Sequence, residues 1–225
     1  MDQTKRQPRI KGWRFVLLVL CSALVASGLV RALWIDGYFI PSQSMEPAFR
    51  QDDRILVSRT AFQTDPVRRG DIVVFDGRGT FAPLDSGRGP LGEAITGAAV
   101  WLGLAGSDTM YIKRVIGVPG DLVACCDSAG MVTVNGEPLD EPYLYPGDVP
   151  STQEFEALVP AGRLWVMGDH RSVSADSRSL LGAPGGGMVP VDRVVGRPIR
   201  IIWPLDRFAP VPRPAAAGPS TQNGQ

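Results

Sequence analysis

The sequence predicts a mainly-β protein with one N-terminal transmembrane helix. Three observations lead to this fold class. A single uncharged apolar run lies near the N-terminus, at residues 15–30. Beyond it, short β-branched and aromatic runs alternate with turn signals, a pattern typical of strands joined by tight turns. Glycine and proline are abundant, with 26 and 20 residues, which argues against a helical bundle.

Residues 1–14 form a basic tail, because they hold five basic residues and a single acid, Asp2. Basic segments beside a membrane span stay on the cytoplasmic side. The tail therefore predicts a cytoplasmic N-terminus, with everything after residue 35 on the opposite, extracytoplasmic side of the cell membrane.

The apolar run is predicted to be a transmembrane anchor at residues 15–35. Sixteen helical residues span about 24 Å, slightly less than a hydrocarbon core of ~30 Å. The side chain of Arg31 can reach the headgroups and so let residues 32–35 extend the span. Trp13 and Trp34 bracket the segment as interfacial anchors would.

A cleaved signal peptide is the alternative interpretation, since it also has a basic start and an apolar core. Small residues such as Ala26 and Ser27 would permit cleavage. The length of the run and the charge and tryptophan at its end favour an uncleaved anchor that crosses the membrane once.

A β-rich domain is predicted at residues 36–208. Asn135-Gly136 suits a tight hairpin turn after Val134. The predicted strands are short apolar runs at residues 54–57, 71–75, 111–118, 131–134, 164–167 and 200–203. Residues 77–108 interrupt them as an insertion, whose stretch 93–104 is either a membrane-surface helix or an ordinary surface segment. The tail at 209–225 is rich in Pro, Ala, Gly, Ser and Gln and is expected to be disordered.

Composition narrows the chemistry. The formal net charge is zero, so nothing indicates nucleic-acid binding. His170 is the only histidine, and Lys113 is the only lysine beyond residue 11, among seventeen arginines from Arg31 onward. Arginine stays protonated, whereas a buried lysine can be neutral, so Lys113 is a candidate base unless it is a remnant of a codon bias.

Cys21 lies in the apolar run, and Cys125 and Cys126 are either a vicinal disulfide or two thiols.

Two segments carry candidate catalytic groups. Ser42 and Ser44 stand two apart between Pro41 and Pro47, so in an extended backbone their side chains share a face. One hydroxyl could act as nucleophile and the other as a donor to the oxyanion that forms. Lys113 lies in a strongly apolar predicted strand, where burial lowers the pKa of an amine. Taken alone, the serine segment could be an ordinary turn, and the segment of Lys113 could be a strand with solvated charges.

A third polar segment covers residues 168–178. Ser174, Asp176 and Arg178 alternate, so in an extended conformation they line one face. Asp176 could then hold Arg178 while Ser174 orients the base. Alone, the segment could equally be a polar loop.

Together these segments resemble the bacterial type I signal peptidases, the Ser/Lys peptidase family S26. Residues 41–47 (PSQSMEP) resemble the nucleophile segment of the family, 69–75 (RGDIVVF) its strand, 113–121 (KRVIGVPGD) its lysine segment, and 168–178 its last conserved segment. They occur in the order of the family and behind its N-terminal anchor. The resemblance covers about residues 12–208.

The resemblance implies roles for these residues. Ser44 would be the nucleophile, Lys113 the general base, and Ser42 with the backbone N–H of Ser44 the oxyanion hole. The supporting residues would be Ser174, which orients Lys113, and Asp176, Arg178 and Arg114. Substrate-binding residues would be Ile40, Ile112 and Tyr111. Gln43 stands where many members have glycine, and His170 replaces an asparagine, which gives it no expected catalytic role.

The resemblance also implies fold and function: coiled antiparallel sheets of the signal-peptidase and LexA-like type, and removal of signal peptides from exported preproteins after a small-x-small motif. No cofactor or metal is expected. The expected partners are preproteins and the lipid bilayer, and the enzyme is expected to be a monomer. Two alternatives are a soluble self-cleaving repressor-type peptidase, against which the anchor speaks, and an inactive membrane-anchored binding domain.

Overall fold

The computed structural model describes residues 12–82, 89, 92, 109–183 and 185–214. It contains one α-helix, two sheets and two short 3₁₀ helices within those ranges. The elements are α1 (Gly12–Leu33), β1 (Ile35–Phe39), β2 (Arg54–Ser58), β3 (Ile72–Asp76), β4 (Met110–Gly117), β5 (Leu122–Cys125), β6 (Val132–Val134), β7 (Glu137–Pro138), β8 (Phe155–Leu158), β9 (Arg163–Met167), β10 (Val189–Pro190), η1 (Val191–Arg193), β11 (Val194–Trp203), η2 (Leu205–Arg207) and β12 (Ala209–Pro210).

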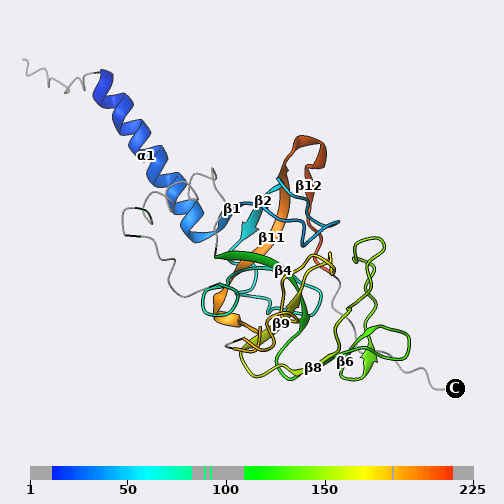
Figure 1. Cartoon of the computed structure of the whole chain (residues 1–225). Helices are drawn as coiled ribbons and strands as arrows, with labels where there is room; N and C mark the ends of the chain where they lie inside the picture. Colours follow the sequence, from blue (N-terminus) through cyan, green and yellow to red (C-terminus); the bar gives the residue numbers. More distant parts are fainter. Residues whose placement is uncertain (1–11, 83–88, 90–91, 93–108, 184, 215–225) are drawn as a thin grey trace, which may run out of the picture.

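The predicted mainly-β class is confirmed. The larger sheet has the strand order β1-β2-β11-β3-β4-β9-β10, and β12 pairs with β11. The smaller sheet has the order β7-β6-β5-β8, and the described strand pairs of both sheets are antiparallel. In Figure 1 the strands β6 and β8 of the smaller sheet lie on the side of the domain away from α1.

The strands form where the sequence places β-branched and aromatic residues between turns. Asn135 and Gly136 both have positive φ, 56° and 86°, which a tight hairpin of the predicted kind requires. They connect β6 to β7 in antiparallel register. The predicted hairpin at this position is therefore confirmed.

Helix α1 projects from the β-domain as a separate arm (Figure 1). It begins at Gly12 and ends at Leu33, two residues before the predicted end of the anchor, because Ile35 already pairs with Ser58 in the sheet. Large apolar side chains from Trp13 to Val25 are about half exposed or more. Within the described part of the chain, no helix reaches the length and hydropathy that a membrane crossing requires.

The expected disorder after residue 208 does not hold for residues 209–214. Arg200 and Ile201 of β11 pair with Pro210 and Ala209 of β12. The guanidinium of Arg213 donates to both carboxylate oxygens of Asp71 at 2.7 Å. The prediction of disorder rested on amino-acid composition, and composition does not indicate contacts between residues far apart in the sequence.

Several expectations fall on residues that the structure does not describe. The basic tail up to residue 11, the stretch 93–104 and the residues from 215 onward lie outside the described ranges, as does most of the insertion. The structure joins Cys125 and Cys126 by a disulfide, and Cys21 is a free, exposed residue of α1.

Candidate active site

Ser44 and Lys113 meet although 69 residues separate them. Lys113 lies on β4, and its Nζ donates a hydrogen bond of 2.6 Å to the Oγ of Ser44. Both residues are buried, with 6% and 4% of their surface exposed. A hydroxyl and an amine in direct contact and shielded from water form the nucleophile and base pair that serine hydrolysis requires.

The turn that carries Ser44 is held by its apolar neighbours. Met45 and Phe49 have no exposed surface and pack in one core cluster with residues of β2, β3 and β4. The backbone N–H of His170 donates to the carbonyl oxygen of Ser44 at 3.2 Å. Ser44 is therefore fixed on both sides, by the core beneath the turn and by the segment that follows β9.

Burial lowers the pKa of Lys113 from 10.5 to about 8. Desolvation is the largest cause, because a buried ammonium loses its hydration. The carboxylates of Asp176 and Asp169 oppose this effect by favouring the charged form, and the cation of Arg178 adds to the lowering. The amine can thus lose its proton near neutral pH, which an exposed lysine cannot do.

This pKa predicts the pH dependence of catalysis. Only the neutral amine can accept the proton of Ser44, so kcat/KM should rise as pH increases through about 8 and then level off. The measurement is kcat/KM from pH 6 to 10, with thermal unfolding recorded at each pH to exclude a loss of folded protein. A profile that is flat across pH 7–9 would contradict the assignment of Lys113 as the base.

Ser42 lies at the open side of the pair. It is an exposed residue, and its Oγ is 3.4 Å from the Oγ of Ser44. From this position its hydroxyl can point toward an oxygen that develops negative charge next to Ser44. Its role in the oxyanion hole stays a prediction.

Asp176 and Arg178 form a buried ion pair next to the base. The guanidinium of Arg178 donates to both carboxylate oxygens of Asp176 at 2.9 and 2.8 Å. The backbone N–H of Gly168 donates to the same carboxylate at 3.0 Å. Burial raises the pKa of Asp176, but the hydrogen bonds from Arg178 and Gly168 outweigh it and the pKa is lowered overall. Asp176 is therefore a carboxylate that anchors the backbone of the last segment.

Ser174 lies beside these groups but is not bonded to Lys113. Its Oγ is buried and makes no hydrogen bond to any described residue, although it is close enough to Asp176 to help lower the pKa of that carboxyl. It also contacts Gly168, because a Cβ at position 168 would lie 2.3 Å from it. The predicted role of Ser174 in orienting Lys113 stays a prediction.

Arg114 points away from Lys113, to the other face of β4. Its guanidinium donates to both carboxylate oxygens of Asp169 at 2.7 and 2.6 Å and to the carbonyl of Gly70 at 2.9 Å. It also lies 3.9 Å from the ring centre of Tyr143. Arg114 thus joins β4 to the segment that supports Ser44.

A third buried ion pair, between Arg171 and Glu141, was not predicted from the sequence. Arg171 also donates to the carbonyl of Gly168 at 3.0 Å, and the hydroxyl of Tyr143 donates to Glu141 at 2.9 Å. Arg171 and Asp169 lie in segment 168–178, which resembles the last conserved segment of the family, but the resemblance predicted no role for them. Glu141 lies in a loop with no periodic pattern, so no signal in the sequence could identify it.

The predicted substrate-binding residues are placed in two clusters. Ile40 and Ile112 belong to the apolar cluster of Met45, with 3% and 8% of their surface exposed. Tyr111 stacks on Phe75 with ring centres 5.8 Å apart. Their contact with substrate stays a prediction.

His170 contributes its backbone to the site. Its ring stacks on Tyr145 with centres 3.8 Å apart, and its Nδ1 is buried without a hydrogen-bond partner among the described residues. Across the same residues, no group of His, Cys, Asp and Glu is arranged to hold a metal ion.

Comparison with known proteins gives one consistent match. The family model described as "Signal peptidase, peptidase S26" matches residues 13–203. The chain is 34% identical over 233 residues to a probable signal peptidase I of Mycobacterium leprae, covering 88% of this chain and 78% of that protein. It is 36% identical over 198 residues to a signal peptidase I of Mycobacterium tuberculosis H37Rv, covering 77% and 67%. A solved signal peptidase I of Enterococcus faecalis aligns with a TM-score of 0.37 at 24% identity, covering 59% of this chain and 97% of that one.

Proposed function

Because the chain belongs to the signal peptidase family, peptidase S26, we propose that Ser44 and Lys113 are the nucleophile and general base of its reaction. The chain is a serine endopeptidase that removes signal peptides from preproteins. The observation that supports the proposed roles is the 2.6 Å hydrogen bond between the Nζ of Lys113 and the Oγ of Ser44.

In the proposed mechanism the neutral amine of Lys113 accepts the proton of Ser44 as the Oγ attacks the scissile carbonyl carbon. The oxyanion that forms accepts hydrogen bonds from the backbone N–H of Ser44 and the hydroxyl of Ser42. Lys113 then returns the proton to the leaving amine as the peptide C–N bond breaks. A water molecule, deprotonated by Lys113, hydrolyses the acyl-enzyme and regenerates Ser44.

Two buried ion pairs support this arrangement. Arg178 holds Asp176, which binds the backbone of Gly168, and Arg114 holds Asp169, which precedes His170. The N–H of His170 binds the carbonyl of Ser44. The proposed function of both pairs is to fix the backbone around the nucleophile, because catalytic groups must be held close to the reactive geometry.

Signal peptidases I are membrane-anchored, and the proposed anchor of this chain is α1. Apolar side chains are exposed on all sides of this helix, from Trp13 to Val25, as expected for a helix in a lipid environment. The basic tail would hold the N-terminus in the cytoplasm and place residues 36–208 outside it. Enzyme and cleavage site would then lie at the same membrane surface.

The proposed specificity is cleavage after a small-x-small motif. The test uses the purified full chain in detergent with a preprotein that carries Ala at positions −1 and −3 of its cleavage site. Intact-mass analysis should show one cut after the −1 residue, and replacement of either Ala by Trp should abolish it. The replacement of the intervening −2 residue is the matched control and should keep the cut. Equal cleavage of the Trp substrates would contradict the proposed specificity.

A further inference from the structure

The turn that carries Ser44 is a closed loop whose two ends are bonded to each other. The N–H of Ile40 donates to the carbonyl of Asp53 at 2.9 Å, and the N–H of Asp52 donates to the carbonyl of Ile40 at 2.9 Å. The position of Ser44 therefore depends on the residues that hold the two ends of the loop together. Asp53 is one of them, and its side chain has contacts that the reaction described above does not use.

The carboxylate of Asp53 is buried, with 1% of its side-chain surface exposed. It accepts the N–H of Arg50 at 2.8 Å, which fixes the second half of the loop. It also accepts two hydrogen bonds of 2.9 Å from the Nε and Nη2 of Arg207. A buried carboxylate without its cation is strongly unfavourable, so Arg207 determines whether this side chain can stay in place.

Arg207 belongs to the C-terminal part of the chain, far from Asp53 in the sequence. It is the last residue of η2, which follows β11, and it lies 154 residues after Asp53. Its Nη2 also lies 3.5 Å from the carbonyl of Ala48. Among the described residues, the hydrogen bonds from residues 205–214 to the loop 40–53 all come from Arg207.

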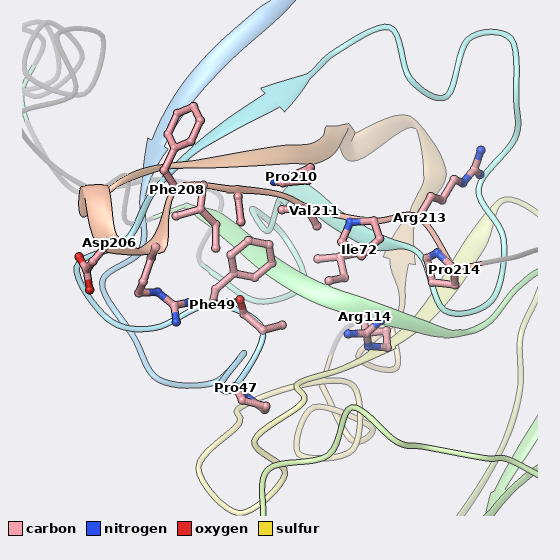
Figure 2. Close-up of a pocket in the computed structure, with 15 residues that line it drawn as sticks. Pro47, Phe49, Ile72, Arg114, Asp206, Phe208, Pro210, Val211, Arg213 and Pro214 are labelled. Atoms are coloured by element: carbon pink, nitrogen blue, oxygen red, sulfur yellow. Dashed lines mark hydrogen bonds between the residues drawn. The ribbon is translucent and has the colours of Figure 1, made fainter.

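A cavity of about 630 Å³ lies between residues 47–49 of the loop and this C-terminal segment. Figure 2 shows Pro47 and Phe49 on the loop side, and Phe208 and Val211 on the C-terminal side. Ser44 and Lys113 do not line this cavity. Beside the cavity, Val211 packs against the apolar cluster that contains Met45 and Phe49. The ion pair of Arg207 and Asp53 adds the polar connection between the segment and the loop.

We infer that Arg207 is a positioning residue, which acts on Ser44 through Asp53 and the loop they close. This inference rests on the proposed role of Ser44 as nucleophile. Arg207 does not touch Ser44, Lys113 or the open side of the pair. Its loss should therefore lower kcat more strongly than it raises KM, because it displaces the nucleophile, whereas among the predicted substrate-binding residues only Ile40 belongs to this loop.

The experiment compares substitutions at both partners in the full chain. Arg207→Gln should lower kcat by about 10- to 100-fold, the scale expected when a catalytic group moves by about 1 Å. Arg207→Lys should recover only part of this loss, because an ammonium cannot form the two parallel bonds that a guanidinium forms. Asp53→Asn should have an effect similar to that of Arg207→Gln, and the double variant should be no worse than either single variant, since both act through one interaction.

The matched control is Arg213→Gln. Arg213 belongs to the same C-terminal segment and pairs with Asp71 and Asp65, but it makes no hydrogen bond to the loop 40–53. This variant should keep kcat within about two-fold. Hydrogen exchange of the amides of residues 41–50, measured by mass spectrometry, should accelerate in Arg207→Gln and not in Arg213→Gln.

Two results would overturn the inference. One is a kcat of Arg207→Gln within about two-fold of the wild type. The other is an equal loss in Arg213→Gln, which would indicate a general loosening of the C-terminal segment. If Arg207→Gln does not fold, Arg207→Lys and the exchange measurement decide instead: wild-type kcat and exchange in that variant would refute the inference. Failure of the wild type to cleave any preprotein would refute the proposed function itself.

Discussion

Replacing Lys113 by arginine should lower kcat by about 10⁴-fold or more, and Ser44→Ala should have an effect of the same size. The arginine keeps the positive charge, but its guanidinium stays protonated and cannot accept the proton of Ser44. The buried lysine, in contrast, has its pKa lowered to about 8 and can be neutral. The measurement is single-turnover cleavage of a preprotein by each purified full-length variant.

The two residues should act as one unit. The double variant Ser44→Ala/Lys113→Arg should be no slower than either single variant, because removing one partner already prevents activation of the other. Lys11→Arg is the control, since it makes the same exchange outside the candidate site, and it should keep wild-type activity. Near-normal cleavage by Lys113→Arg would refute the mechanism.

A loss of activity in these variants can come from loss of the folded protein or from loss of the catalytic base, and the two causes have to be distinguished. Arginine is larger than lysine, and position 113 is 4% exposed, so Lys113→Arg buries a charge that cannot be neutralised. Lys113→Met keeps a similar length without a charge and should be equally inactive while it stays folded. Thermal unfolding of each variant shows which loss comes from destabilisation, and an active Lys113→Met would contradict the assigned base.

Local sequence patterns were sufficient for the features that depend on neighbouring residues. The β-branched runs predicted β2, β3, β4, β6, β9 and the end of β11, Asn135-Gly136 predicted a hairpin turn, and the apolar run predicted the helix. The strands β1, β5 and β8 were not predicted. The meeting of Ser44 with Lys113 was expected from resemblance to a family, because 69 residues separate them and no periodicity connects them. Patterns within one segment cannot report which segments lie side by side.

The ion pairs around the site show this limit most clearly. Glu141 and Asp53 lie in loops, where an acidic residue is ordinarily solvated, and yet each is buried against an arginine. Their partners, Arg171 and Arg207, are 30 and 154 residues away along the chain. The ordered segment 209–214 was missed for the same reason, since its tie to Asp71 is made by Arg213 across the fold.

Gly168→Ala is the second substitution with a large expected effect. A Cβ at this position would lie 2.4 Å from the carbonyl oxygen of Ser44 and 2.3 Å from the Oγ of Ser174. The contact with the Ser44 carbonyl cannot be relieved cheaply, because this group belongs to the nucleophile's own backbone and already accepts the N–H of His170. We expect kcat/KM to fall by about 10²-fold, since the added methyl group must displace Ser44 from Lys113.

The control for Gly168→Ala is Gly182→Ala. No atom lies within 4 Å of a Cβ built at Gly182, so the same added methyl group meets open space, and activity should stay within about two-fold of the wild type. Gly168→Ala should also cost about 1–3 kcal/mol of unfolding free energy, as overpacking of a well-packed site does. A Gly168→Ala enzyme with wild-type kcat/KM would show that the Ser44 backbone can move without losing its contact with Lys113. The support by Gly168, Asp176 and Arg171 would then have no catalytic role.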